Sequence, residues 1–148
     1  MLKLILPMLL AAAGGVSLVI QQALNANLKT ALASAIWPGF ASYLVGVLAM
    51  AALVLVLQEP IPAVSTLARV PWWAWSGGLF GAVFIALGVV LVPKLGAATF
   101  FAALVAGQMI GSMLFDHFGI LGLPVNAISL TRLLGAGLLV SGVLLIRI

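Results

Sequence analysis

The sequence predicts an all-α integral membrane protein with about five transmembrane helices, and three observations support this fold class. Of the 148 residues, 66% are hydrophobic and only 5% are charged, whereas a soluble domain carries about 25% charged residues to face water. Apolar runs long enough to cross a bilayer core, about 20 residues each, recur along the whole chain. These runs leave too little chain for an extramembrane catalytic domain, so we expect a single transmembrane domain over residues 1–148.

The first expected span covers residues 4–28 and ends at Lys29. Its start resembles a secretory signal peptide, because Lys3 precedes an apolar run that reaches three consecutive alanines at 11–13. The apolar run continues to Ile20, however, and cleavage after the alanines would leave a truncated helix. We therefore expect this segment to be retained as a membrane helix.

The second and third expected spans cover residues 36–57 and 72–92. The sequence Gln-Glu-Pro at 58–60 ends the second span. The segment 61–71 contains two further prolines and one arginine, which favour a loop or an interfacial segment. The third span begins with a tryptophan cluster at 72–75, of the kind that anchors helices at the membrane interface.

The fourth and fifth expected spans cover residues 97–118 and 131–146. Between them, residues 119–130 contain glycine, proline and asparagine and are expected to form a loop. The fifth span is short, and Arg132 and Arg147 flank it.

An odd number of spans places the two termini on opposite sides of the membrane, so the basic residues bear on orientation. Cytoplasmic loops are normally enriched in Lys and Arg. Here the basic residues divide evenly, with Lys3, Arg69 and Arg132 on the N-terminal side and Lys29, Lys94 and Arg147 on the other. We therefore expect insertion in both orientations and pairing as an antiparallel homodimer of about ten helices. The alternative is that one charge lies on the other side, or that the N-terminal amine decides the orientation.

Polar residues share one face on each of two expected spans. On the first span, the residues within about 80° of one face are Gly14, Ser17, Gln21 and Asn25. On the fourth span, the polar residues recur every four positions: Gln108, Ser112 and Asp116. Polar groups at membrane depth are costly unless they face the helix bundle or a wet cavity. These two faces therefore predict the lining of a polar path, with hydrogen bonding between neighbouring helices as the alternative.

Four residues are the candidate solute-binding side chains: Gln21, Asn25, Trp75 and Gln108. Gln108 lies near the middle of its span, where an unpaired amide is hardest to hide. Trp75 lies one turn deeper than Trp72, where its ring could stack on an organic solute. The alternative is that Trp75 serves as an interfacial anchor.

Asp116 and His117 form an adjacent acid and imidazole, which could carry a proton-coupled step. The alternative is that both are ordinary residues at a helix end. The glycine pairs Gly77–Gly81 and Gly107–Gly111 have the GxxxG spacing that lets membrane helices approach closely. We expect these glycines to serve helix packing.

The composition argues against several classes of function. The chain has one histidine, no cysteine and two acidic residues on different helix ends, so we expect neither an enzyme nor a metal site. It lacks a phosphate-binding loop, and no cofactor is expected. Its six basic residues are scattered singly, whereas nucleic-acid binding calls for a clustered basic surface. The expected surroundings are the lipid bilayer.

Three stretches of the sequence resemble the YdcZ-like family of small bacterial inner-membrane proteins. The resemblance extends over essentially the whole chain. The stretches that carry it are Gln21-Gln22-Ala23-Leu24-Asn25-Ala26-Asn27-Leu28, Pro71-Trp72-Trp73-Ala74-Trp75-Ser76-Gly77-Gly78 with Gly81, and Val105-Ala106-Gly107-Gln108 through Asp116-His117-Phe118-Gly119. The family is placed in the drug/metabolite transporter superfamily. The resemblance implies a five-helix half-transporter, whose relatives occur as single genes, as pairs or as fused two-half proteins.

The resemblance also sets a limit on mechanism. The four-helix small multidrug exporters, which are related, rely on a membrane-embedded glutamate in their first helix. The first span here has no acidic residue, and Gln21 and Gln22 are neutral. The sequence therefore argues against proton-for-cation exchange by that mechanism.

These observations together predict a secondary transporter that moves a small organic solute by alternating access as an antiparallel homodimer. Inverted halves with a site near the midplane are the recurring plan of such transporters. With few charges available, we expect a neutral or weakly polar solute bound by amides and aromatic faces. The alternative is a membrane scaffold or modulatory subunit that transports nothing, although a scaffold has little need for two polar helix faces.

Overall fold

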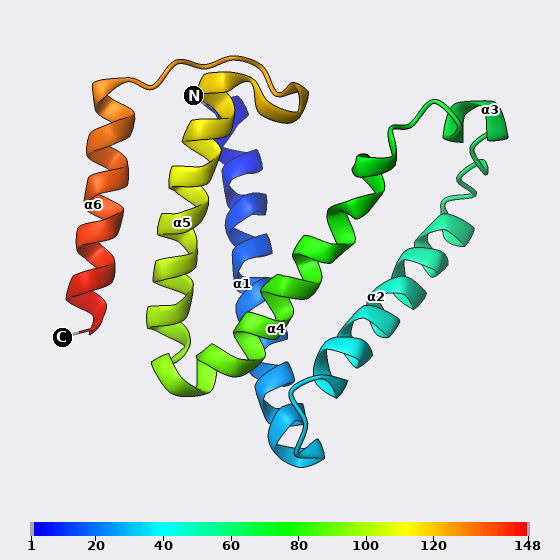
Figure 1. Cartoon of the computed structure of the whole chain (residues 1–148), viewed down its shortest axis with the longest axis horizontal. Coiled ribbons are helices and arrows are strands. Elements are labelled where there is room, and N and C mark those ends of the chain that lie inside the picture. Colours follow the sequence, from blue (N-terminus) through cyan, green and yellow to red (C-terminus); the bar gives the residue numbers. More distant parts are fainter. Residues whose placement is uncertain (1, 148) are drawn as a thin grey trace. The chain divides into compact units, whose positions relative to one another are not determined.

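The computed structural model describes residues 2–147, with side chains from residue 4 to residue 146. Every regular element in this part of the chain is helical: α1 (Leu2–Leu32), α2 (Trp37–Val56), α3 (Val64–Leu67), the 3-10 helix η1 (Trp72–Ser76), α4 (Gly77–Leu95), α5 (Ala97–Phe118), the 3-10 helix η2 (Ile120–Gly122) and α6 (Leu130–Arg147) (Figure 1). The side chains of Lys3 and Arg147, which enter the charge balance, lie outside this description.

Four helical segments are long and apolar enough to cross a membrane: Leu4–Leu32, Trp37–Val56, Trp72–Leu95 and Ala97–Phe118. This confirms the all-helical membrane fold expected from the composition. The fifth expected span, 131–146, falls in a shorter apolar helix, Leu130–Ile146. The 18 residues of α6 extend about 27 Å, slightly less than a bilayer core of about 30 Å. Its crossing of the membrane stays a prediction.

The chain divides into two compact units, one that ends at Pro93 and one that begins at Lys94. In the first unit, α1 packs on α2, and side chains of both helices contact α4, through Lys29 of α1 and Tyr43 of α2. The turn between α1 and α2 follows from local sequence. Ala33 takes a left-handed conformation with φ 47°, and the Ser34 hydroxyl accepts hydrogen bonds from the backbone N–H groups of Ile36 and Trp37. Pro38 then occupies the first turn of α2, where its missing N–H is not needed.

The second unit is a pair of packed helices, α5 and α6, which lie side by side (Figure 1). Helix α5 ends at Gly119, whose φ of 61° is the left-handed conformation that commonly terminates helices. Most large apolar side chains on the described helices are exposed in the single chain. Exposed apolar faces of this extent belong against lipid or against another membrane helix.

Candidate functional site

Two carboxamides of α1 are enclosed in the first unit. Gln22 is 0% exposed and Asn25 is 2% exposed, and they are the buried polar side chains in the described part of the chain. Asn25 belongs to the polar face that the sequence predicts, whereas Gln22 lies beside that face and is not among the candidate residues. The i, i+3 spacing of Gln22 and Asn25 puts both on one face of α1.

Asn25 holds α1 against α2 through one hydrogen bond. The Ser42 hydroxyl donates to the Asn25 Oδ1 at 2.8 Å. The Asn25 Nδ2 is buried and has no hydrogen-bond partner. The carboxamide therefore has free N–H groups beside the contact between the two helices.

Gln22 lies against the backbone of α4. A Cβ in place of a hydrogen at Gly88 would overlap the Gln22 carboxamide, so this glycine makes the room that the side chain occupies. Neither the Oε1 nor the Nε2 of Gln22 has a hydrogen-bond partner. An unsatisfied buried polar group costs about 1–3 kcal/mol, so two such amides on one helix face call for a functional explanation.

A groove of about 420 Å³ runs between α1 and α2. Its polar lining comes from four side chains: Ser17, Gln21, Asn25 and Ser42. Apolar residues such as Leu24 and Val45 complete the walls. The structure thus brings two of the four candidate residues, Gln21 and Asn25, into one groove at membrane depth.

Lys29 ends the polar face of α1 and turns toward α4. Its Nζ donates a hydrogen bond of 3.2 Å to the carbonyl oxygen of Val89, a residue that is 0% exposed. In an α-helix that carbonyl would accept from the N–H four residues later, but residue 93 is a proline inside α4 and has no N–H. The Lys29 ammonium replaces the missing donor.

Asp116 and His117 act on the loop between α5 and α6. The Asp116 carboxylate pairs with Arg132 at 3.2 Å, and the His117 Nδ1 accepts a hydrogen bond from the backbone N–H of Ile128. The Asp116 backbone carbonyl accepts from the N–H of Asn126 at 2.8 Å. These contacts match the helix-end interpretation of both residues, and their part in proton coupling stays a prediction.

Comparison with known proteins places this chain in a family. The family described as "Putative inner membrane exporter, YdcZ" matches residues 6–145. The inner membrane protein YdcZ of Escherichia coli strain K12 is 31% identical over 134 residues, which cover 90% of this chain and 89% of that protein. The chain belongs to the YdcZ family. No solved structure matches it.

Membership of the YdcZ family confirms the resemblance seen in the sequence, and it places the chain among multi-pass proteins of the inner membrane. The family description supports a role in transport across that membrane. It is also consistent with a protein that is not an enzyme.

The other two candidate solute-binding residues of this YdcZ-family chain do not line the groove. Trp75 belongs to η1, is 63% exposed and lines none of the grooves found in the described residues. Gln108 is an exposed residue of α5, in the second unit. The roles of Trp75 and Gln108 in solute binding stay predictions.

The four glycines expected to serve packing differ in their surroundings. A Cβ at Gly81 would overlap the Tyr43 hydroxyl, which donates a hydrogen bond to the Gly78 carbonyl at 3.1 Å. At the other three glycines, a Cβ would have no neighbouring atom of another segment within 4 Å: Gly77, Gly107 and Gly111. Packing against these three positions stays a prediction, and in the described chain their faces are free for another helix.

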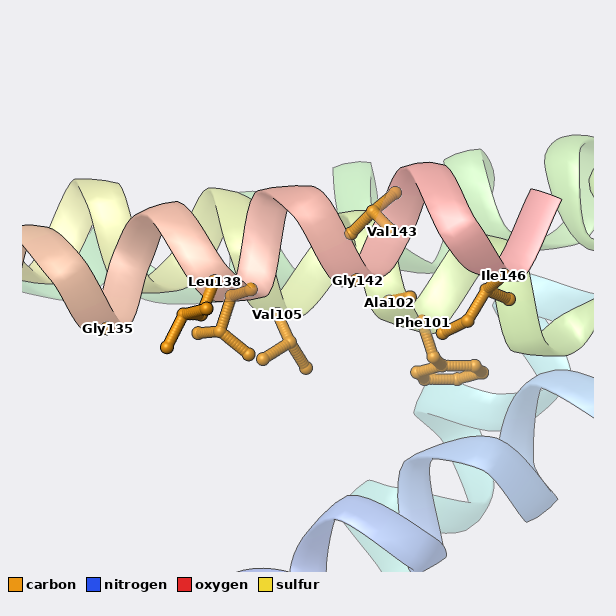
Figure 2. A pocket seen from close by; sticks show the side chains of 9 residues that line it. Phe101, Ala102, Val105, Gly135, Leu138, Gly142, Val143 and Ile146 are labelled. Atoms are coloured by element: carbon orange, nitrogen blue, oxygen red, sulfur yellow. The ribbon is translucent and has the colours of Figure 1, made fainter. Parts of the chain in front are cut away.

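An apolar groove of about 530 Å³ lies on the second unit of this YdcZ-family chain. Figure 2 shows Phe101 and Val105 of α5 beside Leu138 and Ile146 of α6, with Gly135 at one end. No polar side chain lines it. This groove therefore has the character of a lipid or helix contact, and the polar groove on α1 and α2 is the better candidate for solute.

Proposed function

We propose that this chain is a secondary transporter that moves a small organic solute across the inner membrane, with the polar groove between α1 and α2 as part of the path. The observation that carries the proposal is the pair of buried carboxamides, Gln22 and Asn25, whose N–H groups have no partner. Membrane helices tolerate polar groups where they face a partner or a wet cavity. A path for a polar solute would provide both.

The functional unit in this proposal is an antiparallel homodimer that works by alternating access. The even division of basic residues between the two sides supports insertion in both orientations. Two inverted copies would then supply the pseudo-symmetric halves between which secondary transporters place their site. The open space beside Gly107 and Gly111 offers a surface on which helices of the second copy could pack closely.

The proposal predicts that water reaches the groove inside the membrane. The chain has no native cysteine, so Ser42→Cys introduces a single thiol into the groove lining. In reconstituted vesicles we expect this thiol to react with a membrane-impermeant methanethiosulfonate reagent. A thiol ionises and reacts in water and is inert in hydrocarbon, so the rate constant of modification measures access to the groove.

The matched control is Leu44→Cys, two residues further along α2. Leu44 is 50% exposed in the single chain and does not line the groove between α1 and α2. We expect its thiol to react at least about tenfold more slowly, because only the thiolate reacts and lipid suppresses ionisation. Equal and very slow reaction at both positions would contradict a transport path and would favour a scaffold or modulatory subunit.

A further inference from the structure

Lys29 carries a positive charge that has no counter-ion in its own unit. The chain has two acidic residues, Glu59 and Asp116, and Asp116 pairs with Arg132 in the second unit. Glu59 follows the far end of α2, 17 residues beyond Ser42, which corresponds to about 25 Å along a helix. The ammonium is partly buried and makes one described hydrogen bond, to a neutral carbonyl.

Lys29 lies next to the groove rather than beyond it. Asn25 and Lys29 are spaced i, i+4, so their Cβ atoms are about 5–6 Å apart on the surface of α1. Asn25 lines the groove, and the Lys29 side chain is directed from that face toward Val89. The stripe Ser17, Gln21, Asn25 and Lys29 thus leads, at intervals of four residues, from the groove to the ammonium.

Donors outnumber acceptors among the unpaired buried amide groups of α1. Asn25 contributes free Nδ2 hydrogens and Gln22 contributes free Nε2 hydrogens, whereas the Gln22 Oε1 is the one unpaired acceptor recorded among buried side chains. An ammonium has three hydrogens, of which Lys29 uses one on Val89. Surplus donors around an uncompensated positive charge match the chemistry of an anion.

We propose that the transported solute is a small organic anion, whose carboxylate or equivalent group binds the Lys29 ammonium and the free N–H groups of Asn25. This inference rests on the proposed transport function and names the chemical class of its solute. It departs from the neutral solute expected from composition, because the part-buried Lys29 ammonium is directed toward the buried Val89 residue.

The test uses the single thiol of Ser42→Cys and two reagents of opposite charge. One reagent is the anionic sulfonatoethyl methanethiosulfonate and the other is the cationic trimethylammonioethyl methanethiosulfonate. The rate constant of each reagent with the protein thiol is divided by the rate constant of the same reagent with free 2-mercaptoethanol, which removes differences in intrinsic reactivity. We expect the anion-to-cation ratio to exceed one. Lys29→Gln should lower that ratio at least about twofold, because a unit charge near the thiol favours one reagent and disfavours the other.

Lys94→Gln is the matched control, because it removes one positive charge from a residue that the charge balance assigns to the same side of the membrane as Lys29. Lys94 is an exposed residue in the last turn of α4 and lines no described groove. Lys94→Gln should leave the ratio unchanged. A second measurement needs no charge variant: benzoate should slow modification of the thiol more than benzamide or benzylammonium, which have the same ring and a different charge.

The outcomes separate the two proposals. A preference for the anionic reagent that Lys29→Gln abolishes, together with protection by benzoate, supports an anionic solute. Modification by both reagents in a ratio that Lys29→Gln does not change, or protection by benzylammonium instead of benzoate, overturns the anionic solute and leaves the transport path in place. Failure of the thiol to react with either reagent overturns the path itself.

Discussion

At the scale of single residues, the contact between Gly88 and Gln22 decides how closely α1 approaches α4. A glycine that packs against a carboxamide at membrane depth is unusual, because the amide gains no hydrogen bond from it. The glycine instead provides the volume that keeps a polar side chain inside the protein. Gly88 therefore contributes to the site although it carries no chemistry.

We predict that Gly88→Ala destabilises the protein by about 1–3 kcal/mol, which is typical of overpacking. Gly78→Ala on the same helix is the control, since a Cβ there meets open space, and alanine is the better helix former. Thermal unfolding in detergent would compare the two. Gln22→Ala should relieve most of the effect of Gly88→Ala, and equal effects of Gly78→Ala and Gly88→Ala would show that the contact does not constrain the helices.

At the scale of helices, Pro93 and Lys29 act together on α4. The proline leaves the Val89 carbonyl without its intrahelical donor, and the ammonium of α1 supplies a replacement at 3.2 Å. This pairs the ends of α1 and α4 through a backbone group rather than through a salt bridge. In the second unit, Gly119 caps the end of α5, and the Asp116–Arg132 ion pair joins α5 to α6.

Pro93→Ala should uncouple Lys29 from α4. The alanine restores an N–H to the Val89 carbonyl, so Lys29→Met should destabilise the Pro93→Ala protein less than the wild-type protein. The expected difference is about 0.5–1.5 kcal/mol, the usual contribution of a hydrogen bond. A double-mutant cycle of unfolding free energies measures it. Additive effects of the two substitutions would mean that the hydrogen bond contributes nothing.

At the scale of the whole molecule, the division of charge between the two sides governs insertion. Six basic residues stand three against three when the five helices are taken as spans, and the bias that normally orients a membrane protein is then zero. Insertion in both orientations would follow from this balance. It would also let one gene supply both inverted halves of a transporter.

Single cysteines placed near Lys3 and near Arg147 should each be labelled from outside in about half of the molecules, as expected for zero charge bias. One added charge should then tip the balance. Ala35→Lys, in the turn between α1 and α2, should retain that side in the cytoplasm, and Ser65→Lys, in α3, should retain the opposite side. Labelling of intact cells measures both effects. A terminus that is always outside in the unmodified protein would refute dual insertion.

Much of the fold could be predicted from the sequence, because lipid as a solvent imposes simple rules. Long apolar runs must become helices there, and the expected spans overlap helices of the structure, with ends that differ by a few residues. The predicted third span begins at Trp72, where the structure has the short helix η1 before α4. The predicted fifth span coincides with α6, whose limited length leaves its crossing of the membrane open to the labelling experiment.

The candidate site could be predicted only in part. Gln21 and Asn25 were accessible to sequence reasoning because both lie on one helix, and helical spacing alone places them together. Gln22 was missed as a site residue because its importance depends on Gly88, 66 positions later in the sequence. Only the i, i+7 spacing of Gln22 and Lys29 could have linked Gln22 to the polar face that Lys29 ends.

Composition and periodicity by themselves determined that this chain is a helical membrane protein, where its main helices run, and which face of α1 is polar. These properties depend on the solvent and on the pitch of one helix. The tertiary structure alone decided that Lys29 turns inward to the Val89 carbonyl and that the free N–H groups of Gln22 and Asn25 are enclosed. Such properties depend on which helices meet and at which residues, because burial and hydrogen bonding arise between segments far apart in the sequence.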